Sequence, residues 1–254
     1  MINRTAIISK KSIIGKNVSI GPYCIIEDDV VIGDNTSIGP YSIIKKFTEI
    51  GNDCRIFSHC VLGEIPQDKK FNNEITKLII GDRNTIREFC TINRGTDESG
   101  KTIIGNDCLF MAYVHVAHDC ILKNDIILAN GVQLGGHVEI NDFAIVGGMT
   151  PVHQFCKIGK YAFVGGGLRV VQDVPPFIIA NGEPLKFSGI NILGLRRRKF
   201  NSLDRDKIKK IYKLIYNSEY NVSQAINYIN ENFKNIEYIN DIVSFIKSSK
   251  RGII

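Results

Sequence analysis

Large apolar residues recur at every sixth position between residues 104 and 170, without a single slip. The positions are Ile104, Phe110, Val116, Leu122, Leu128, Leu134, Ile140, Val146, Val152, Ile158, Val164 and Val170. A mostly compact residue stands two places before each of them from Phe110 onward. A period of six matches neither the helical period of about 3.6 nor the alternation of an ordinary strand. It predicts a parallel β-helix, whose repeats bury their apolar faces only against their neighbours.

The same repeat opens the chain and is interrupted twice. Aliphatic residues occupy every sixth position from Ile2 to Leu62, and the pattern resumes at Ile80. Residues 63–78 and 93–102 break it with polar sequence, so we predict that both are loops leaving the coil. Long loops on a regular scaffold often carry function, and a solvated surface loop is the alternative for each.

Helical periodicity replaces the hexads from about Phe187. Asn201 and Asn221 stand where the N-cap residues of two helices are expected. The apolar face of the first predicted helix comprises Leu203, Ile208, Ile211, Leu214 and Ile215. We therefore divide the chain into a β-helix over residues 1–186 and a small α-helical domain over residues 187–254. Such a tail can cover the last coil, whose strand edges would otherwise be unpaired.

Positive charge is concentrated in this tail. Residues 186–254 hold 14 Lys and Arg against 6 Asp and Glu, whereas the whole chain carries a formal charge of +6. A basic surface predicts an acidic partner. Nucleic acid is disfavoured, because neither a nucleic-acid motif nor an aromatic platform accompanies the charge. No apolar stretch reaches the length of a signal peptide or a membrane span, which predicts a cytoplasmic protein.

The cysteines are predicted to be packing residues. All seven occupy the small hexad position, two places before a large apolar residue. A buried free cysteine behaves as a small hydrophobe. Because no pair has the CxxC spacing, neither a disulfide nor a cysteine metal site is predicted.

The repeat also places the histidines. If three hexads make one triangular coil, residues 18 apart lie on adjacent coils at a strand spacing of about 4.8 Å. His118, His137 and His153 then fall close to one corner on three successive coils, out of phase with the inward positions. Gly136 lies directly above His118, and His115 lies on the same coil. The sequence thus predicts an outward edge at which four of the five histidines gather.

This edge has the residues for proton transfer. A histidine suits a general base that takes a proton from a hydroxyl. Asp119, next to His118, is placed to orient the ring or to favour its protonated form, and Gly136 offers an unobstructed N–H to a developing oxyanion. These roles suit acyl transfer from a thioester to an alcohol. Two alternatives stay open: three histidines can bind zinc, and polar corner residues can simply fill turns.

Several motifs resemble one known family over essentially the whole chain. They are Gly81–Glu88, His115–Cys120, Gly147–Cys156 and Gln172–Pro176, set in a hexad coil with a helical tail. In order and spacing they are similar to the acyl-carrier-protein-dependent UDP-N-acetylglucosamine O-acyltransferases of lipid A biosynthesis. The resemblance implies a left-handed parallel β-helix and a homotrimer with active sites between subunits. It also implies transfer of a 3-hydroxyacyl chain to the 3-hydroxyl of UDP-N-acetylglucosamine, with no cofactor and no metal.

The resemblance assigns roles residue by residue. His118 matches the general base, Asp119 matches the carboxylate that assists this base, and Gly136 matches the N–H donor to the oxyanion. Positions lining the sugar-nucleotide and pantetheine sites, or contacting substrate, are Asp68, Lys70, His115, His137, His153, Gln154, Asn191, Arg197 and Arg198. The two arginines and Asn191 correspond to contacts with the nucleotide, and a guanidinium suits phosphate. Gly166 matches the position that limits acyl-chain length, and the basic tail fits docking of an acidic acyl carrier protein.

One position departs from the family pattern. Leu193 stands where the family commonly has Glu, so one nucleotide contact is not carried over. Related enzymes remain as alternatives: a 3-amino sugar nucleotide acyltransferase, or a zinc enzyme like the γ-carbonic anhydrases. The N-acyltransferase of the same pathway is disfavoured, because here the coil begins at Ile2. A coil serving only as an assembly scaffold is the non-enzymatic alternative, and it predicts no binding of sugar nucleotide.

Overall fold

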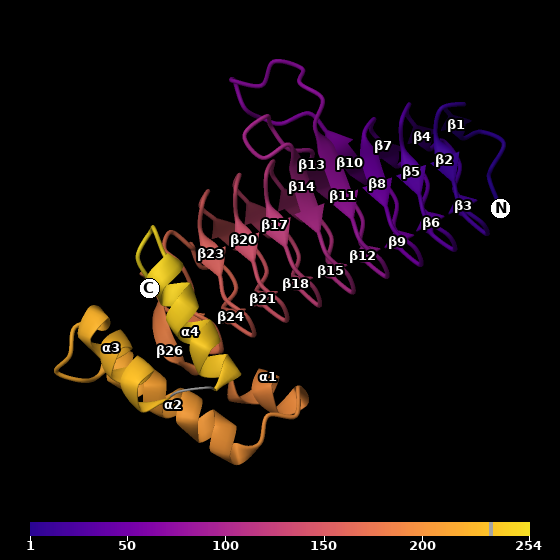
Figure 1. The fold of residues 1–254 in the computed structure, drawn as a ribbon. Helices are drawn as coiled ribbons and strands as arrows, with labels where there is room; N and C mark the ends of the chain where they lie inside the picture. The colour runs from indigo at the N-terminus through magenta and orange to yellow at the C-terminus, as the bar shows by residue number, and fades with distance from the viewer. Residues whose placement is uncertain (234–235) are drawn as a thin grey trace.

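The chain winds into a three-sided coil whose last turns are covered by short helices (Figure 1). The computed structural model describes residues 1–233 and 236–254. Each turn of the coil contributes one short strand to each of three parallel sheets. The predicted fold class is confirmed: the protein is a left-handed parallel β-helix followed by a helical tail. This is the opposite hand to the usual crossover between parallel strands.

Three sheets form the sides of the coil, and we number them by their first strand. Sheet 1 contains β1 (Ile7–Ile8), β4 (Ile25–Ile26), β7 (Ile43–Ile44), β10 (Val61–Glu64), β13 (Thr91–Asn93), β16 (His115–Val116), β19 (Gln133–Leu134) and β22 (Pro151–Val152). Sheet 2 contains β2 (Ile13–Ile14), β5 (Val31–Ile32), β8 (Thr48–Ile50), β11 (Lys77–Ile80), β14 (Lys101–Ile104), β17 (Ile121–Leu122), β20 (Glu139–Ile140) and β23 (Lys157–Ile158). Sheet 3 contains β3 (Ser19–Ile20), β6 (Ser37–Ile38), β9 (Arg55–Ile56), β12 (Thr85–Ile86), β15 (Leu109–Phe110), β18 (Ile127–Leu128), β21 (Ile145–Val146), β24 (Phe163–Val164), β25 (Ile178–Asn181) and β26 (Lys186–Ile190).

The register confirms a coil of three hexads. Paired residues such as His115 and Gln133 lie 18 positions apart. The spacing grows to 30 between Val61 and Thr91 and to 24 between Thr91 and His115. Both extra segments leave the coil between sheet 1 and sheet 2, where the sequence predicted loops. The strands stay stacked around the loops, with one register shift between Leu62 and Glu64 where β10 pairs with β13.

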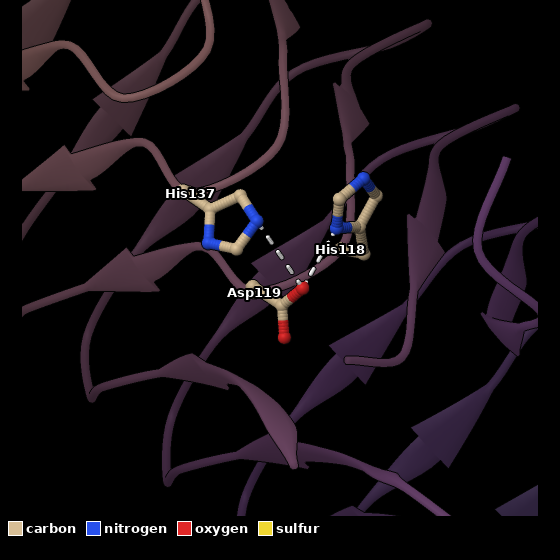
Figure 2. A group of neighbouring side chains, drawn as sticks. All are labelled: His118, Asp119 and His137. Atoms are coloured by element: carbon tan, nitrogen blue, oxygen red, sulfur yellow. Dashed lines mark hydrogen bonds and ion pairs between the residues drawn. The ribbon is translucent and has the colours of Figure 1, made fainter. Parts of the chain in front are cut away.

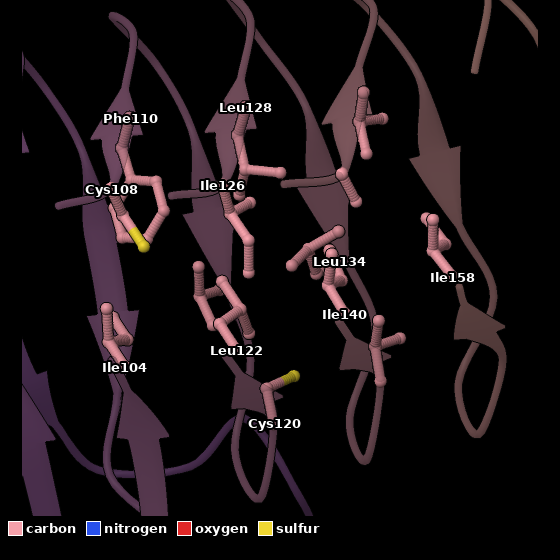
Figure 3. Packing of buried hydrophobic residues seen from close by; sticks show 14 of the residues in the cluster. Ile104, Cys108, Phe110, Cys120, Leu122, Ile126, Leu128, Leu134, Ile140 and Ile158 are labelled. Carbon is pink, nitrogen blue, oxygen red and sulfur yellow. The ribbon is translucent and has the colours of Figure 1, made fainter. Parts of the chain in front are cut away.

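The core is a column of hexad side chains inside the coil (Figure 3). Like side chains stack along the axis, as Ile104, Leu122, Ile140 and Ile158 do on successive turns of sheet 2. All seven cysteines are free and buried, as predicted. Fully burying one such aliphatic side chain stabilises a fold by roughly 1.5–3 kcal/mol. The repeated core therefore makes the coil a rigid frame for its outer corners.

The tail covers the end of the coil, but it begins with a strand. Residues 186–190 form β26, which pairs antiparallel with β25, so the expected helical start near Phe187 is wrong. The helices are α1 (Ile192–Arg197), α2 (Ser202–Tyr216), α3 (Val222–Asn232) and α4 (Glu237–Ser248). The division of the chain after residue 186 stays a prediction, and the β25–β26 hairpin crosses it.

The helix caps follow the sequence prediction. Asn201 accepts a hydrogen bond from the Asp204 N–H, and Asn221 forms a capping box with Gln224. Ile208, Ile211 and Ile215 are buried, whereas Leu203 is 70% exposed and does not join the apolar face. Leu203 lies in the first turn of α2. None of the helices within the described ranges is long and apolar enough to cross a membrane.

Side chains of the tail are tied to the last coil. Tyr212 of α2 donates a hydrogen bond to the Pro176 carbonyl, and Ser249 donates to the Asp173 carboxylate. The other Asp173 oxygen accepts the Lys157 N–H of β23. Backbone groups at the open edge of the coil thus gain partners, which is the capping role expected of the tail.

Candidate active site

The corner between sheet 1 and sheet 2 gathers most of the predicted site. Both loops, residues 65–76 and 94–100, leave the coil at this corner. The turns after β16, β19 and β22 occupy the same corner on the next three coils, and they carry His118, His137 and His153 respectively. Figure 1 shows the two loops rising from one edge of the coil. We call this edge the histidine corner. It comprises the two loops, β16, and the turns that carry His118, His137 and His153.

His118 and Asp119 form a hydrogen-bonded pair at its centre (Figure 2). The His118 Nδ1 lies 2.7 Å from the Asp119 Oδ2. The His118 side chain is 13% exposed, and its Nε2 makes no hydrogen bond to any residue that the structure describes. The carboxylate thus fixes one ring nitrogen, and the other is left for a substrate.

The two groups shift each other's pKa in opposite directions. The hydrogen bond that His118 donates to Asp119 raises the pKa of His118 above its ordinary value, and this outweighs the opposing effect of burial. Burial would raise the pKa of Asp119, but hydrogen bonds from His118, Ser99 and Thr96 hold it far below its usual range. The carboxylate is therefore ionised at neutral pH and stabilises an imidazolium beside it.

Gly136 packs against the His118 ring, as the 18-residue spacing predicted. A Cβ on Gly136 would lie 2.6 Å from the His118 Cε1 and 2.8 Å from its Nε2. Only glycine lets the backbone approach the ring so closely. Within the described chain, the buried Gly136 N–H donates to no group. An unpaired N–H beside a free imidazole nitrogen suits a developing oxyanion.

His137 lies beside the pair on the next coil. Its ring meets the His118 ring edge-on at 5.2 Å and stacks on Phe155 at 4.5 Å. The His137 Nε2 lies 3.6 Å from the Asp119 Oδ2 and 3.5 Å from a carboxylate oxygen of Glu98. The stacking holds His137 in a position from which it can contact a bound substrate.

A metal centre fits this cluster less well than a proton-transfer pair does. His118, Asp119 and His137 bring three ligand atoms within 4.8 Å of one another. Both Asp119 oxygens, however, already accept hydrogen bonds, from Thr96 and Ser99 on one oxygen and from Thr96 and His118 on the other. A cation would have to displace these donors. The arrangement therefore favours general-base chemistry over the zinc alternative.

The other predicted residues of this corner surround the pair. His115 faces outward from β16, and its Nδ1 lies 2.7 Å from the Thr91 hydroxyl. Burial, and then the charge of His118, lowers the pKa of His115. Asp68, in the first loop, is close enough for its charge to raise the pKa of His118, and it accepts the Lys70 N–H. The Lys70 side chain itself is exposed.

His153 and Gln154 lie at the far end of the corner. Both are exposed, and the His153 Nδ1 lies 3.0 Å from the Gln154 carbonyl oxygen. Gly166 lies in the turn between sheet 3 and sheet 1, where a Cβ would meet the Gly148 carbonyl oxygen at 3.1 Å. Because Gly166 is exposed, a larger side chain there would project from the surface of the coil near this turn.

The predicted nucleotide contacts of the tail lie on a different side of the molecule. Asn191 and Arg197 line a cavity of about 650 Å³ formed with Ile145, Phe163 and Ile179 of sheet 3. Sheet 3 is the side opposite the histidine corner. One copy of the chain therefore does not bring these residues to His118.

The side chains of Asn191 and Arg198 are engaged within the chain. Asn191 accepts the Gly194 N–H at the start of α1 and donates to the Tyr161 carbonyl. Arg198 pairs with Asp125 at 3.2 Å and lies over the Phe143 ring. Leu193, at the position of the family's Glu, is 66% exposed beside the cavity.

Two residues that contact Asp119 were not predicted from the sequence. Thr96 and Ser99 of the second loop donate hydrogen bonds to its carboxylate. Only the polarity of residues 93–102 pointed to this loop, and polarity alone does not distinguish a functional loop from a solvated one.

Family models match parts of this chain, and known proteins match it along nearly its whole length. Residues 173–254 match the model described as UDP-N-acetylglucosamine O-acyltransferase, domain 2. Residues 11–46, 29–64 and 101–136 match the bacterial transferase hexapeptide model. The acyl-carrier-protein–UDP-N-acetylglucosamine O-acyltransferase of Aliarcobacter butzleri is 50% identical, and the match covers 99% of this chain and 97% of that protein.

Solved structures agree with these matches. The UDP-N-acetylglucosamine acyltransferase of Bacteroides fragilis has a TM-score of 0.98 at 44% identity, with all of both chains covered. A structure from Acinetobacter baumannii has a TM-score of 0.97 at 40% identity, covering 100% of this chain and 99% of the other.

Proposed function

Because this chain belongs to the acyl-carrier-protein–UDP-N-acetylglucosamine O-acyltransferase family, we propose a mechanism in which the histidine corner is its active site. The protein is an acyltransferase of lipid A biosynthesis. It moves an acyl chain from acyl carrier protein to UDP-N-acetylglucosamine. In the finer proposal, the donor is a 3-hydroxyacyl thioester on phosphopantetheine, and the acceptor is the sugar 3-hydroxyl.

His118 acts as the base in this mechanism. Its free Nε2 takes the proton of the acceptor hydroxyl as that oxygen attacks the thioester carbonyl carbon. The oxyanion of the tetrahedral intermediate accepts the Gly136 N–H. When the intermediate collapses, the C–S bond breaks, and His118 returns the proton to the departing sulfur. The observation that carries the proposal is the His118–Asp119 hydrogen bond of 2.7 Å, which leaves Nε2 free beside Gly136.

A homotrimer accounts for the separation of the predicted site residues. Asn191 and Arg197 lie against sheet 3, and Arg198 lies at its border with sheet 2, away from the histidine corner of the same chain. If these residues bind the nucleotide, they come from a neighbouring copy whose tail faces this corner. We propose that Asp68, Lys70, His115, His137, His153 and Gln154 line the rest of the substrate site. Light scattering tests this arrangement: a monomer at assay concentration would contradict shared sites.

The basic tail is the proposed docking surface for the acyl carrier protein. The 14 Lys and Arg of residues 186–254 suit docking of an acidic carrier protein. A cytoplasmic location stays a prediction.

The direct test of the reaction is acyl transfer from a panel of 3-hydroxyacyl carrier proteins to UDP-N-acetylglucosamine. We expect a product with one added acyl group that mild alkaline hydroxylamine cleaves, because an ester is labile to it and an amide is not. A hydroxylamine-resistant product would move the acceptor to an amino sugar. Transfer at no chain length would contradict the proposed donor or acceptor.

Replacing Gly166 by leucine tests the position proposed to limit chain length. Gly166 lies exposed on the outside of the coil, so a leucine there projects into the space beside the turn rather than into the core. We expect the preferred acyl chain to become shorter by several carbons. Each CH₂ that the leucine prevents from being buried costs a long donor about 0.8 kcal/mol. On the best donor, we expect kcat to stay within about tenfold of wild type. An unchanged length profile would remove Gly166 from this role.

The Asp119→Asn variant tests the electrostatic role of the carboxylate. A base works only when it is neutral, so kcat/KM is lost as the pH falls through the pKa of His118. Asp119 raises that pKa. Asparagine removes the charge, so we expect the acid limb of kcat/KM to move to lower pH. We also expect the plateau to fall by about 10²-fold or more, because the ring loses its orientation.

Asp142→Asn is the matched control for this variant. Asp142 accepts hydrogen bonds from Asn124 on another corner of the coil, where Asn124 and Asn106 hold the equivalent positions on earlier turns. We expect its pH profile to match that of the wild type. An acid limb that stays in place in Asp119→Asn would show that Asp119 does not set the pKa of the base.

A further inference from the structure

The loop of residues 94–100 folds over the buried carboxylate of Asp119. It connects β13 to β14 one coil before His118, at the same corner. The Asp119 side chain is fully buried, and most of its immediate polar surroundings come from this loop. The mechanism above gives the loop no role.

Three donors of the loop point at the carboxylate. The Thr96 N–H lies 2.9 Å from the Asp119 Oδ1, and the Thr96 hydroxyl lies 2.7 Å from its Oδ2. The Ser99 hydroxyl donates to Oδ1 as well. With the His118 bond, each oxygen accepts two hydrogen bonds, so the plane of the carboxylate is fixed.

The other side of the loop is held by the coil and by the first loop. Asn93 donates to the carbonyls of Glu64 and Ile65. A Cβ on Gly95 would lie 2.4 Å from the Lys101 nitrogen, so the chain crosses itself closely there. The loop is thus a braced segment rather than a free one.

Arg94 links the loop to the segment that carries Asp68 and Lys70. Its guanidinium lies 5.5 Å from the ring centres of Phe47 and Phe71, and Phe71 belongs to that first loop. The residue is only 2% exposed. Its contacts therefore fix the second loop against the first, between the proposed substrate segment and Asp119.

We propose that Thr96 and Ser99 are positioning residues of the reaction. They hold the Asp119 carboxylate in hydrogen-bonding position for the His118 Nδ1, and their hydrogen bonds share the negative charge of Asp119. This inference rests on the proposed role of His118 as the base. Without the loop donors, the same charge would be directed at the imidazole alone. The acid–base behaviour of His118 is then set partly by the loop that carries Thr96 and Ser99.

Several other charged or titratable groups lie near the His118–Asp119 pair. Asp68 and Glu98 act on His118 through their charges, and Glu98 also lies 3.5 Å from the His137 Nε2. His137 lies 3.6 Å from Asp119, and His115 adds a titrating group on β16. The Thr96 hydroxyl also accepts the Glu98 N–H, whereas the Ser99 hydroxyl makes no contact with these groups. An effect shared by Thr96→Val and Ser99→Ala therefore isolates the loop donors.

The test compares Thr96→Val, Ser99→Ala and the conservative Thr96→Ser. Valine keeps the Thr96 shape and N–H but removes one hydrogen bond to Asp119. We expect kcat/KM to fall by about 10- to 100-fold, part of the effect of a general base, with KM nearly unchanged. We expect its acid limb to move to higher pH, because Asp119 then stabilises the His118 imidazolium more strongly. Thr96→Ser should restore both quantities.

NMR titration of the His118 ring separates this inference from the proposed mechanism. We expect the titration of Thr96→Val to move upward together with the kinetic limb. If His118 is not the base, the ring titration still moves and the kinetic limb does not. If the loop has only a structural role, the melting temperature falls while the ring titration and pH profile stay unchanged, which would overturn the inference. Thr36→Val is the control, because its buried hydroxyl bonds Gly51 on an early coil.

Discussion

Replacing His118 by alanine is expected to lower kcat/KM by about 10²- to 10⁴-fold or more, the contribution of a positioned general base. The variant loses the only group proposed to take the proton of the acceptor hydroxyl, while the apolar core of the coil is untouched. The side chain lies on the outer corner, with Asp119 as its hydrogen-bond partner. We therefore expect the melting temperature to stay within a few degrees of wild type. Steady-state transfer with a single acyl donor is the measurement.

His59→Ala is the matched control for this variant. His59 is the one histidine away from the histidine corner, and its ring stacks between Tyr41 and Phe89. Removing it costs stacking energy of about 0.5–1.5 kcal/mol and should leave turnover intact. Wild-type turnover by His118→Ala would exclude His118 as the base.

Gly136→Ala is expected to be the second most damaging change, lowering kcat by about 10²- to 10³-fold, as much as disabling one oxyanion donor. Alanine keeps the N–H, so the added methyl group is what causes the loss. The new methyl group would lie 2.6 Å from the His118 Cε1. Because the clash is with a side chain and not with backbone, the coil can stay folded while the imidazole is pushed away from Asp119. The ring loses its alignment and the proposed oxyanion site is disturbed in the same step.

The double variant His118→Ala/Gly136→Ala shows which of these effects dominates. If the methyl group acts by displacing the ring, adding Gly136→Ala to His118→Ala changes the residual rate little. If the methyl group acts mainly by crowding the oxyanion beside the Gly136 N–H, the two losses multiply. A single Gly136→Ala variant with a rate within about twofold of wild type would contradict both roles.

The position of the site was predictable because a coil of constant period converts sequence spacing into distance. The spacing of 18 places Gly136 on His118, and the structure brings the two into contact. His137 falls one residue beyond Gly136 and also reaches Asp119. His153 was expected at the same corner, and it lies there, exposed and one coil further on.

The contribution of the second loop was not predictable from the same spacing. Thr96 and Ser99 lie in an insertion, where the register between β13 and β16 grows to 24 residues. Their hydrogen bonds to Asp119 depend on how the loop folds back, which hexads do not determine. Asn191 is a similar case: nothing in the sequence indicates that its amide both caps α1 and binds the Tyr161 carbonyl.

The β25–β26 hairpin shows a different limit of the sequence. The apolar residues near Phe187 form a short run, and short runs do not separate strand from helix by periodicity. Pairing with β25 decides the outcome, because it extends sheet 3 beyond β24. The turn at residues 182–185 brings β26 back alongside β25.

The most direct test of the central claim is to compare two pH titrations of the wild-type enzyme. One is the NMR titration of the His118 ring, and the other is the acid limb of kcat/KM for transfer to UDP-N-acetylglucosamine. We expect the two titrations to share a midpoint, displaced above the ordinary histidine pKa by Asp119. An acid limb that does not follow the titration of His118 would contradict the claim that this histidine is the base.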